Sequence, residues 1–384
     1  MTESLYIHIP FCLRKCPYCD FFSIPYEKSM EARYVNALIR ELRLRRQSIG
    51  TLKTIYIGGG TPTVFGADSI TRIIEFICDN FNVEHGAEIT IEANPSSVDR
   101  EKLQAIRSTG INRISLGVQS FNGWQLQWLG RLHDCAEAVE ALTIIKENFN
   151  NFSFDLIYGL PGQSVEDWIN SLKLALSFSP PHISAYELTP ETGTPLGEWI
   201  DRAEASLPAE DDITAMYNAA AELFAGAGLC HYEISNYAID GFQCRHNQNY
   251  WRRGLYAGVG AGAHSHLPVI AQNDSVRSSN APDITQYLTA IECGTLPVRQ
   301  EMIIDRRQRH EEDIFLGLRT SEGITIDKLT GIETSALNML IENGLGTLNG
   351  SRFRLTRNGF LVSNRIIAVI IDALPPYSHK SLFP

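Results

Sequence analysis

The chain has 384 residues, which is enough for one large barrel-type domain with a smaller unit or for two to three average domains. Hydrophobic residues make up 44% and charged residues 20%, which are ordinary values for globular proteins and exclude disordered, collagen-like and coiled-coil chains. The formal net charge of -11 argues against general binding to nucleic acids or anionic membranes, because proteins that neutralise phosphates are normally basic.

The N-terminus has no basic region and no long apolar stretch, so no signal peptide is predicted. The longest apolar run near the C-terminus, residues 366–374, is interrupted by Asp372 and is too short to cross a bilayer, so no transmembrane segment is predicted. Eight cysteines are too few for a disulfide scaffold in a chain of this length. We therefore expect a cytoplasmic protein whose thiols stay reduced and are free to bind metal.

Up to about residue 200, short strands that are apolar almost throughout alternate with helical stretches, as expected for a parallel sheet. The six predicted strands span residues 5–9, 54–57, 88–92, 113–118, 152–157 and 182–186. The five predicted helices between them span residues 30–46, 68–81, 100–109, 136–148 and 165–177. This spacing of right-handed βαβ units predicts an α/β fold with a partial (β/α)6 parallel TIM-like barrel, and a doubly wound open sheet is the alternative. In both, ligands bind beyond the C-terminal ends of the strands.

After about residue 205 the pattern changes. Residues 209–227 are predicted to form an amphipathic helix, and a segment rich in Gly, Tyr, Trp and His follows over 229–266. Helices predicted over 311–318 and 333–342, with a hairpin over 346–356, resemble a small winged-helix α+β unit. We predict three parts, namely the barrel over 1–205, an extension with the aromatic segment over 206–300, and a winged-helix-like domain over 301–384. Because the chain is acidic, the last part is interpreted as a packing domain in preference to a DNA-binding one.

Three cysteines, Cys12, Cys16 and Cys19, follow the first strand with the spacing C-x3-C-x2-C. Zinc usually takes four ligands, commonly as two separated pairs, and the sequence has no second cysteine pair with suitable spacing. Three thiolates on one loop can hold three irons of a 4Fe-4S cluster and leave the fourth iron open for S-adenosylmethionine, whose reductive cleavage gives a 5′-deoxyadenosyl radical. We predict such a cluster, with zinc or an unligated loop as the alternatives.

The run from Tyr6 to Phe21 resembles the radical SAM family of oxygen-independent coproporphyrinogen oxidases and their haem-chaperone relatives. The resemblance continues at Gly58-Gly-Gly-Thr-Pro62, Ile91-Glu-Ala-Asn-Pro95, Leu116-Gly-Val-Gln-Ser-Phe121, Asp155-Leu-Ile-Tyr-Gly-Leu-Pro161 and Leu316-Gly-Leu-Arg319. It therefore extends over essentially the whole chain, and it implies that the barrel is of the radical SAM type.

Gly59, Gly60 and Thr61 follow the second predicted strand. A glycine run can be only a tight turn. Alternatively, because glycine has no side chain, the run can let the backbone approach a bound molecule. The resemblance implies that all three residues contact the methionine part of S-adenosylmethionine.

Glu92, Gln119 and Asp155 stand at the ends of the third, fourth and fifth predicted strands. A single polar side chain there could be a helix cap or part of a structural ion pair, since burying it without a partner is costly. Three on successive strands favour a polar ligand. Acidic and amide groups suit the cations and hydroxyls of S-adenosylmethionine, and a guanidinium suits its carboxylate.

The resemblance implies the carboxylate-binding role for Arg131, and it implies that Tyr6 and Tyr18 border the cofactor. Without the resemblance, the two tyrosines would be interpreted as core residues.

Three features favour the haem-chaperone (HemW-type) branch of this family. Porphyrinogen-decarboxylating members carry a fourth cysteine where this chain has Phe21, and they carry an N-terminal extension for which this chain has no room. The segment from His246 to Trp251 matches the H-N-x-x-Y-W motif of the haem chaperones, and the resemblance implies haem binding near His246. A neutral imidazole can ligate haem iron, whereas the alternative is a surface loop with packed aromatic residues.

The sequence therefore predicts a haem chaperone that carries a 4Fe-4S cluster, S-adenosylmethionine and haem, and that passes haem to acceptor proteins such as respiratory-chain components. The alternative is an enzyme, the oxygen-independent coproporphyrinogen III dehydrogenase. In that reaction the deoxyadenosyl radical abstracts hydrogen from a propionate, and loss of carbon dioxide leaves a vinyl group. No nucleic-acid partner is expected in either case.

Overall fold

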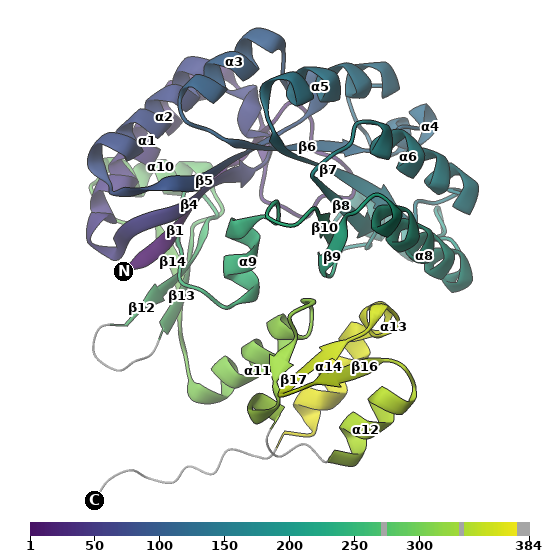
Figure 1. Ribbon diagram of the computed structural model, residues 1–384. Coiled ribbons are helices and arrows are strands. Elements are labelled where there is room, and N and C mark those ends of the chain that lie inside the picture. The colour runs from purple at the N-terminus through teal and green to yellow at the C-terminus, as the bar shows by residue number, and fades with distance from the viewer. Residues whose placement is uncertain (270–274, 330–333, 375–384) are drawn as a thin grey trace, which may run out of the picture.

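A computed structural model describes residues 1–269, 275–329 and 334–374, and a curved sheet of nine strands dominates it (Figure 1). The strand order is β11-β1-β4-β5-β6-β7-β8-β10-β9, and all neighbours from β11 to β8 are parallel. The six strands predicted from the sequence are β1 (Thr2–Ile9), β4 (Ile49–Gly59), β5 (Val83–Ala93), β6 (Arg113–Gln119), β7 (Asn151–Tyr158) and β8 (His182–Glu187). The predicted partial parallel barrel is confirmed.

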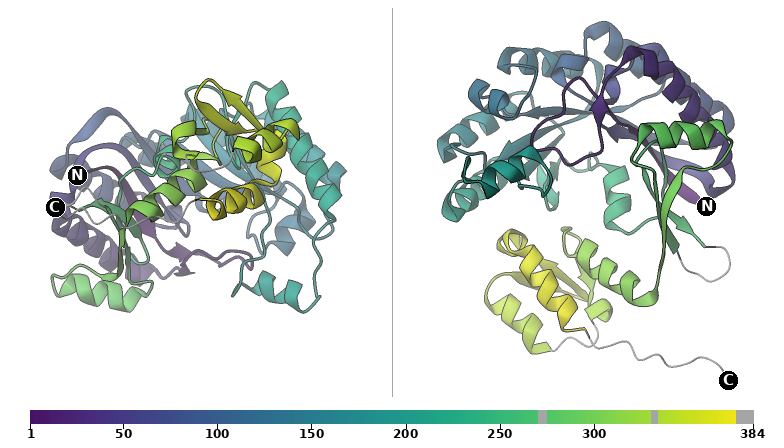
Figure 2. Two further views of the ribbon diagram at one scale, coloured as in Figure 1. Left: turned by 90° about the horizontal axis from the view of Figure 1, so that it is seen from below. Right: turned by 180° about the vertical axis from the view of Figure 1, so that it is seen from behind.

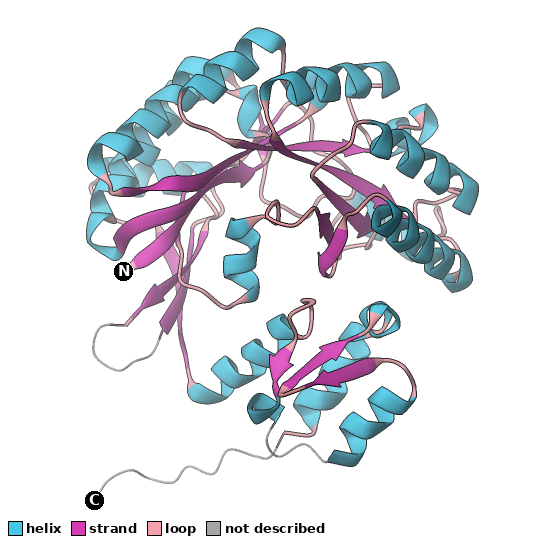
Figure 3. Cartoon of the chain, in the orientation of Figure 1, coloured by secondary structure: helices cyan, strands magenta, loops and turns pink. Residues whose placement is uncertain are grey.

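Helices cover the convex face of this sheet, as Figure 3 shows. They are α1 (Lys28–Leu44), α2 (Ala67–Asn80), α3 (Arg100–Ser108), α5 (Cys135–Asn148) and α6 (Val165–Ser177), close to their predicted bounds, with a short α4 (Gly123–Trp128). β4 and β5 each begin about five residues before their predicted starts, because polar and glycine-containing stretches there still pair, as in the register of Leu52 with Val83.

The parallel strands are not apolar on both sides, which corrects the sequence interpretation. Along β5, Ile89 and Ile91 are buried in the main hydrophobic cluster of the molecule, whereas Glu88, Thr90 and Glu92 alternate with them. Successive strand residues point to opposite faces, so each strand presents apolar residues to the helices and polar residues to the concave side. The same alternation occurs in the other central strands, with Ser4, Tyr6 and His8 in β1, Thr54 and Tyr56 in β4, Arg113 and Ser115 in β6, Ser153 and Asp155 in β7, and His182 and Ser184 in β8.

The segment after β8 folds back onto this barrel. Its elements are α7 (Pro195–Asp201), α8 (Glu210–Gly226), β9 (Cys230–Glu233), β10 (Asn236–Ala238), α9 (Arg245–Trp251) and β11 (Ala257–Val259). α8 confirms the predicted helix and packs on α6, and α9 lies on the concave side of the sheet (Figure 1). β11 then pairs in parallel with β1 at the edge of the barrel.

A second, antiparallel sheet was not predicted. It consists of β12 (His264–Pro268), β13 (Ser275–Asn280) and β14 (Val298–Ile304), and α10 (Ile284–Glu292) between the last two packs on α1. These strands contain many Ser, Arg and Gln residues, so they lack the apolar runs by which the barrel strands were recognised.

The C-terminal part is a compact α+β unit below the barrel (Figures 1 and 2). Its helices are α11 (Arg306–Gly317), α12 (Thr334–Glu342), α13 (Arg357–Leu361) and α14 (Ser363–Asp372), and its sheet has the order β15 (Ile324–Thr325), β17 (Arg352–Leu355), β16 (Gly346–Asn349). The predicted hairpin is present and turns at Gly350, whose φ of 60° suits glycine. The predicted helices over 311–318 and 333–342 are present as α11 and α12, except that Glu333 lies outside the described residues.

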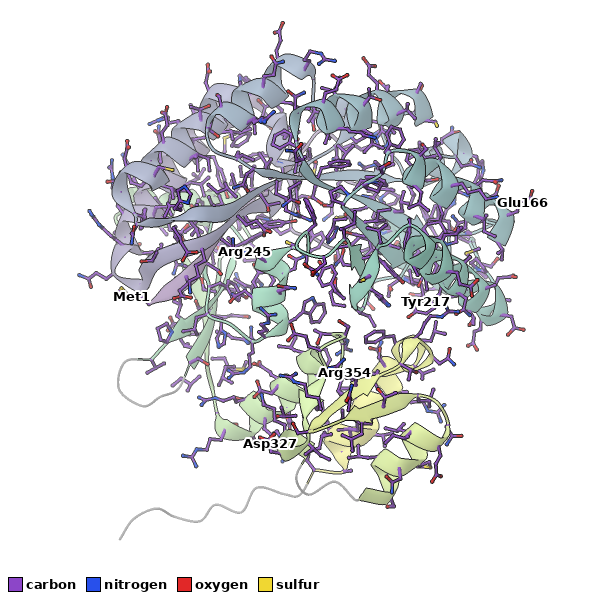
Figure 4. All side chains as sticks on the ribbon, in the orientation of Figure 1. Met1, Glu166, Tyr217, Arg245, Asp327 and Arg354 are labelled. Carbon is purple, nitrogen blue, oxygen red and sulfur yellow. The ribbon has the colours of Figure 1, made fainter. Side chains whose placement is uncertain are left out.

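The C-terminal unit is attached to the barrel through α8. The Tyr217 hydroxyl donates a hydrogen bond of 3.2 Å to the Arg357 carbonyl, and Arg357 forms an ion pair of 3.0 Å with Glu222 (Figure 4 labels Tyr217). The divisions at residues 205 and 300 stay predictions. Within the described residues, no helix is both long and apolar enough to span a membrane.

Candidate cofactor site

A cavity of about 380 Å³ opens at the C-terminal ends of the parallel strands, and we call it the cofactor cavity. Most of the predicted site residues line it, namely Cys12, Cys16, Tyr18, Cys19, Gly59, Gly60, Thr61, Glu92, Gln119, Arg131 and Asp155. Tyr6 and His246 are not among its lining residues. The volume is in the range of small-molecule ligand pockets.

The three thiols lie on the loop that follows β1. The loop is held at its ends by a short parallel pairing between β2 (Phe11–Cys12) and β3 (Ile24–Pro25), and its three cysteine side chains are partly buried. Burial raises the pKa of the Cys12 thiol and raises the pKa of the Cys19 thiol to about 11. Binding to iron must therefore displace protons from these thiols, as metal binding to cysteine generally does.

A single metal ion and an iron–sulfur cluster require different arrangements of the three thiols. Within the part of the chain that the structure describes, no three His, Cys, Asp or Glu side chains converge closely enough to hold one metal ion. A single zinc ion requires such convergence, whereas the thiolates of an iron–sulfur cluster bind different irons. The three thiols face one cavity, so the donor set fits the predicted cluster.

Arg131 connects the thiol loop to the barrel. Its Nη1 donates to the Cys16 sulfur at 3.6 Å, and its Nη2 donates to the Gly117 carbonyl at 2.7 Å and to the Asn94 side chain. Its Nε is buried and has no hydrogen-bond partner among the described residues. An unpaired buried guanidinium N–H is costly, and the carboxylate of a ligand in the cavity would satisfy it.

Asn94 was not predicted as a site residue. Its side-chain nitrogen donates to the Thr61 hydroxyl at 2.6 Å while its oxygen accepts from Arg131. It therefore fixes Thr61 and Arg131 relative to each other. Asn94 lies two residues after Glu92 in a stretch that carried the family resemblance, so this position could have identified it as a candidate site residue.

Two of the carboxylates that line the cavity, Glu92 and Asp155, are partly buried and lack a direct ion pair among the described residues. Glu92 accepts hydrogen bonds from the Tyr56 hydroxyl at 2.8 Å and the Gly59 backbone at 3.0 Å, yet burial raises its pKa to about 7. Burial also raises the pKa of Asp155 to about 6, although hydrogen bonds from Ser184 and Ser115 oppose this rise. A cationic ligand would favour the ionised form of both groups, because an opposite charge nearby stabilises a carboxylate.

The glycines at the end of β4 are required by packing as well as by any ligand. A Cβ atom on Gly59, which has a φ of 117°, would lie 2.6 Å from a ring carbon of His8, and one on Gly60 would lie 2.6 Å from the Phe11 carbonyl oxygen. The N–H groups of Gly60 and Thr61 already bond to the carbonyls of Ile9 and Phe11. A ligand ammonium, which is a donor, would therefore use carbonyl or hydroxyl oxygens here. Gln119 at the end of β6 has a φ of 69°, a conformation that is uncommon for residues other than glycine and that is enriched at functional sites.

His246 lies on α9, toward the N-terminal halves of the strands. Glu88 binds the start of this helix, accepting hydrogen bonds of 3.0 Å from the backbone N–H of Arg245, which Figure 4 labels, and of His246. The His246 ring is completely buried, with Nδ1 2.8 Å from the Thr54 hydroxyl and Nε2 2.8 Å from the Tyr250 hydroxyl. Burial lowers its pKa to about 3, so the ring is neutral. Neither ring nitrogen is free to bind iron in this arrangement.

Tyr6 stands between these two regions. Its ring stacks on that of Tyr56, with centroids 6.2 Å apart, and its hydroxyl lies 2.9 Å from Nδ1 of His8. It is therefore part of the packed interior beside the cofactor cavity.

The outward face of α9 borders a second cavity, of about 330 Å³, between the barrel extension and the C-terminal unit. Gln248, Trp251 and Arg252 line it from α9, and Lys328 and Arg352 line it from the C-terminal unit. The motif of the sequence analysis is thus divided, with His246 and Tyr250 directed inward and Trp251 at the second cavity.

Comparisons with known proteins give family matches for two parts of the chain. The family model of the radical SAM superfamily matches residues 6–175, and the model of the HemN C-terminal domain matches residues 304–362. The solved structure of coproporphyrinogen III oxidase (HemN) from Escherichia coli, described as a radical SAM enzyme, superimposes with a TM-score of 0.80 over 97% of this chain and 90% of that chain. Because the two sequences are 22% identical, this likeness concerns the fold alone.

Curated relatives are similar over nearly the whole length. The protein named heme chaperone HemW from Haemophilus influenzae is 35% identical over 96% of this chain and 97% of its own length. The protein of the same name from Bacillus subtilis is 32% identical over 97% of this chain and all of its own length, and that from Escherichia coli is 39% identical over 68% and 69%.

Proposed function

The chain belongs to the HemW family of haem chaperones within the radical SAM proteins, and from this premise we propose that it binds haem and delivers it to acceptor proteins. The observation that carries the proposal is the similarity to proteins of that name over 96% of the chain. Acceptors of the proposed kind are haem-requiring components of the respiratory chain, and the proposed location is the cytoplasm.

We propose that Cys12, Cys16 and Cys19 hold three irons of a 4Fe-4S cluster at the mouth of the cofactor cavity. S-adenosylmethionine bound beside such a cluster can be cleaved reductively to a carbon-centred radical, which is the chemistry that the radical SAM domain implies. The unpartnered Nε of Arg131 supports an interaction with the cofactor carboxylate. The raised pKa values of Glu92 and Asp155 support interactions with its cationic and hydroxyl groups.

Gly59, Gly60 and Thr61 would hold the methionine part of the cofactor, and Tyr18 and Gln119 would border it, because all five line the same cavity. Tyr6 would support the cavity from behind.

We propose that haem binds at α9, with two routes that experiments can separate. Ligation by His246 requires the Tyr250 hydroxyl to leave Nε2, since that nitrogen is engaged at 2.8 Å. Contact through Trp251 needs no such change, because the indole already borders the second cavity.

The alternative function, named in the sequence analysis, is that of a coproporphyrinogen III dehydrogenase. The likeness to HemN does not decide between the two functions, because it concerns the fold alone. Against the dehydrogenase function, Phe21 occupies the position of the fourth cysteine that the decarboxylating enzymes carry, and its side chain is 64% exposed.

The test combines transfer and turnover. Haem-loaded protein should restore activity to a haem-depleted b-type respiratory enzyme faster than an equal amount of free haem. The same preparation, given coproporphyrinogen III, S-adenosylmethionine and dithionite without oxygen, should form no protoporphyrinogen. Product formation without haem transfer would replace the proposal by the enzyme.

A further inference from the structure

Arg113 is a buried charge that no part of the proposed function yet uses. It lies at the start of β6 with its side chain on the concave side, and it is 2% exposed. Its Nη2 donates to the Ser153 hydroxyl at 2.9 Å, while its Nε is buried and has no hydrogen-bond partner among the described residues. No ion pair joins it to a carboxylate in the described part of the chain. Burial of an ion without a paired counter-ion is unfavourable, so a purely structural role for Arg113 would reduce the stability of the fold.

A short series of hydroxyl groups leads from Arg113 to the cofactor cavity. The hydroxyls of Ser153 and Ser115 are 2.8 Å apart across the β6–β7 pairing, where the two residues are in register. Ser115 lies two residues before Gly117, which pairs in register with Asp155, and the Ser115 side chain lowers the pKa of the Asp155 carboxyl group.

The chemistry of these groups allows a series that runs from Arg113 to Asp155. A guanidinium can only donate, so the Ser153 oxygen accepts from Arg113, and the Ser153 proton can be donated to Ser115. Ser115 can then donate to Asp155, which must be ionised to act purely as an acceptor. The series is therefore satisfied throughout when Asp155 carries a negative charge.

The charges around Asp155 come from several strands. Arg113 and Arg131 lower its pKa, whereas Glu92 faces it as a like charge from β5, and the neutral phenols of Tyr186 and Tyr56 complete its surroundings. Arg131 is committed to Gly117, Asn94 and Cys16. Arg113 has no ion pair with a carboxylate among the described residues, and Cys244 and Glu88 are the acidic groups that raise its own pKa.

We propose that Arg113 is a positioning residue that, through Ser153 and Ser115, holds Asp155 ionised and oriented toward bound S-adenosylmethionine. This inference rests on the proposed function in one respect, that Asp155 contacts the cofactor. It adds Arg113, which lies at the end of β6 opposite to the cavity. Through Asp155, Arg113 sets how strongly the cavity binds a cation.

The proposal has a definite pH dependence. Protonated Asp155 attracts a cation less than ionised Asp155, so affinity for S-adenosylmethionine should increase as the pH rises through the pKa of Asp155, about 6, and that of Glu92, about 7. Loss of the Arg113 charge raises the pKa of Asp155 further. In a variant that lacks this charge, the increase in affinity for S-adenosylmethionine should therefore occur at higher pH. The affinity of the variant should approach that of the wild type at pH values where the wild-type affinity no longer changes.

The experiment is anaerobic calorimetry of S-adenosylmethionine binding to the cluster-reconstituted protein between about pH 6 and 8.5. R113M should weaken binding about tenfold near the lower end, which corresponds to about one unit of pKa, and far less at the upper end. R113K should recover most of the loss, because it keeps the charge. S115A should show a shift of the same sign and smaller size.

Matched variants make each outcome decisive. T90V is the control, since Thr90 is paired in register with Arg113 and its buried hydroxyl has no partner among the described residues. D155N should weaken binding at every pH, and if it does not, the role of Asp155 in the proposed function is wrong. If D155N weakens binding while R113M and S115A follow the wild-type pH curve, Arg113 is not a positioning residue. If R113M fails to fold, R113K and S115A still test the proposal. If the affinity of S115A for S-adenosylmethionine differs from that of the wild type by the same factor at every pH, the connection from Arg113 to Asp155 is contradicted.

Discussion

The cofactor cavity and the α9 region occupy opposite ends of the same concave surface, and they differ in how fully their polar groups are satisfied. At the cofactor cavity, the Nε of Arg131 is unpartnered among the described residues, and Glu92 and Asp155 have raised pKa values. At α9, Glu88 accepts from the first turn of the helix, and both ring nitrogens of His246 are engaged.

The cofactor cavity therefore has polar groups that are available to a ligand, whereas the α9 region is closed, because its polar groups already bind one another. Groups that are buried without partners are costly, and a ligand that binds beside them can supply the missing partner. The cofactor cavity is therefore preorganised for a charged small molecule. Any ligand of His246 must first displace hydrogen bonds, so its affinity is reduced by the free energy of that rearrangement.

The largest expected effect comes from removing one thiol. In C16A, one of the three irons bound by cysteine loses its thiolate ligand, so the cluster should not be retained. We expect the iron–sulfur absorbance to be lost and the iron and sulfide contents to fall below stoichiometric values. Circular dichroism should show an intact barrel, since the Cys16 side chain is only partly buried. The matched control is C78A, which removes an exposed thiol on α2 and should keep the cluster. Full iron content in C16A would contradict the proposed ligands.

The sequence predicted most of the residues that line the cofactor cavity, because the order of the strands determines which side chains meet there. Glu92 and Gln119 lie at the ends of β5 and β6, Asp155 lies three residues before the end of β7, and parallel strands place their C-terminal ends at one edge of the sheet. Knowing the strands was therefore enough to bring these side chains together.

The polar interior was predictable in principle and was missed. Arg113, Ser115 and Ser153 alternate with apolar neighbours along β6 and β7, and this period of two indicates a strand with one polar face. The apolar runs alone do not indicate a polar face.

The environment of His246 could not be predicted from sequence. Its partner Thr54 is 192 residues away, and only the return of the chain into the concave side of the barrel brings them to 2.8 Å. A motif gives the residue types in a short segment, but not which face of the short helix α9 is buried.

The second effect concerns His246 itself. H246A removes a completely buried ring and two hydrogen bonds, so we expect a loss of about 2–4 kcal/mol in the free energy of unfolding, measured by urea denaturation. H182A is the matched control, because His182 is also buried and its Nε2 lies 2.8 Å from the Tyr232 hydroxyl. Both variants should be destabilised, but only H246A should weaken the Soret shift in a haem titration. Equal haem binding by the two variants would leave Trp251 as the contact on α9.

The smallest effect is the most discriminating, because it opens the closed region without removing its histidine. Y250F deletes the hydroxyl that engages Nε2 of His246 and keeps the ring that packs edge-on against it at 4.9 Å. We expect the protein to lose about 1 kcal/mol of stability, the net value of one hydrogen bond, and haem to bind up to about fivefold more tightly, since iron no longer competes with that bond. Y217F is the control, because it removes a phenol hydrogen bond of 3.2 Å far from α9 and should change haem affinity little. If Y250F loses stability while its haem affinity stays at the wild-type value, iron does not bind Nε2, and the closed character of the α9 region persists in the haem complex.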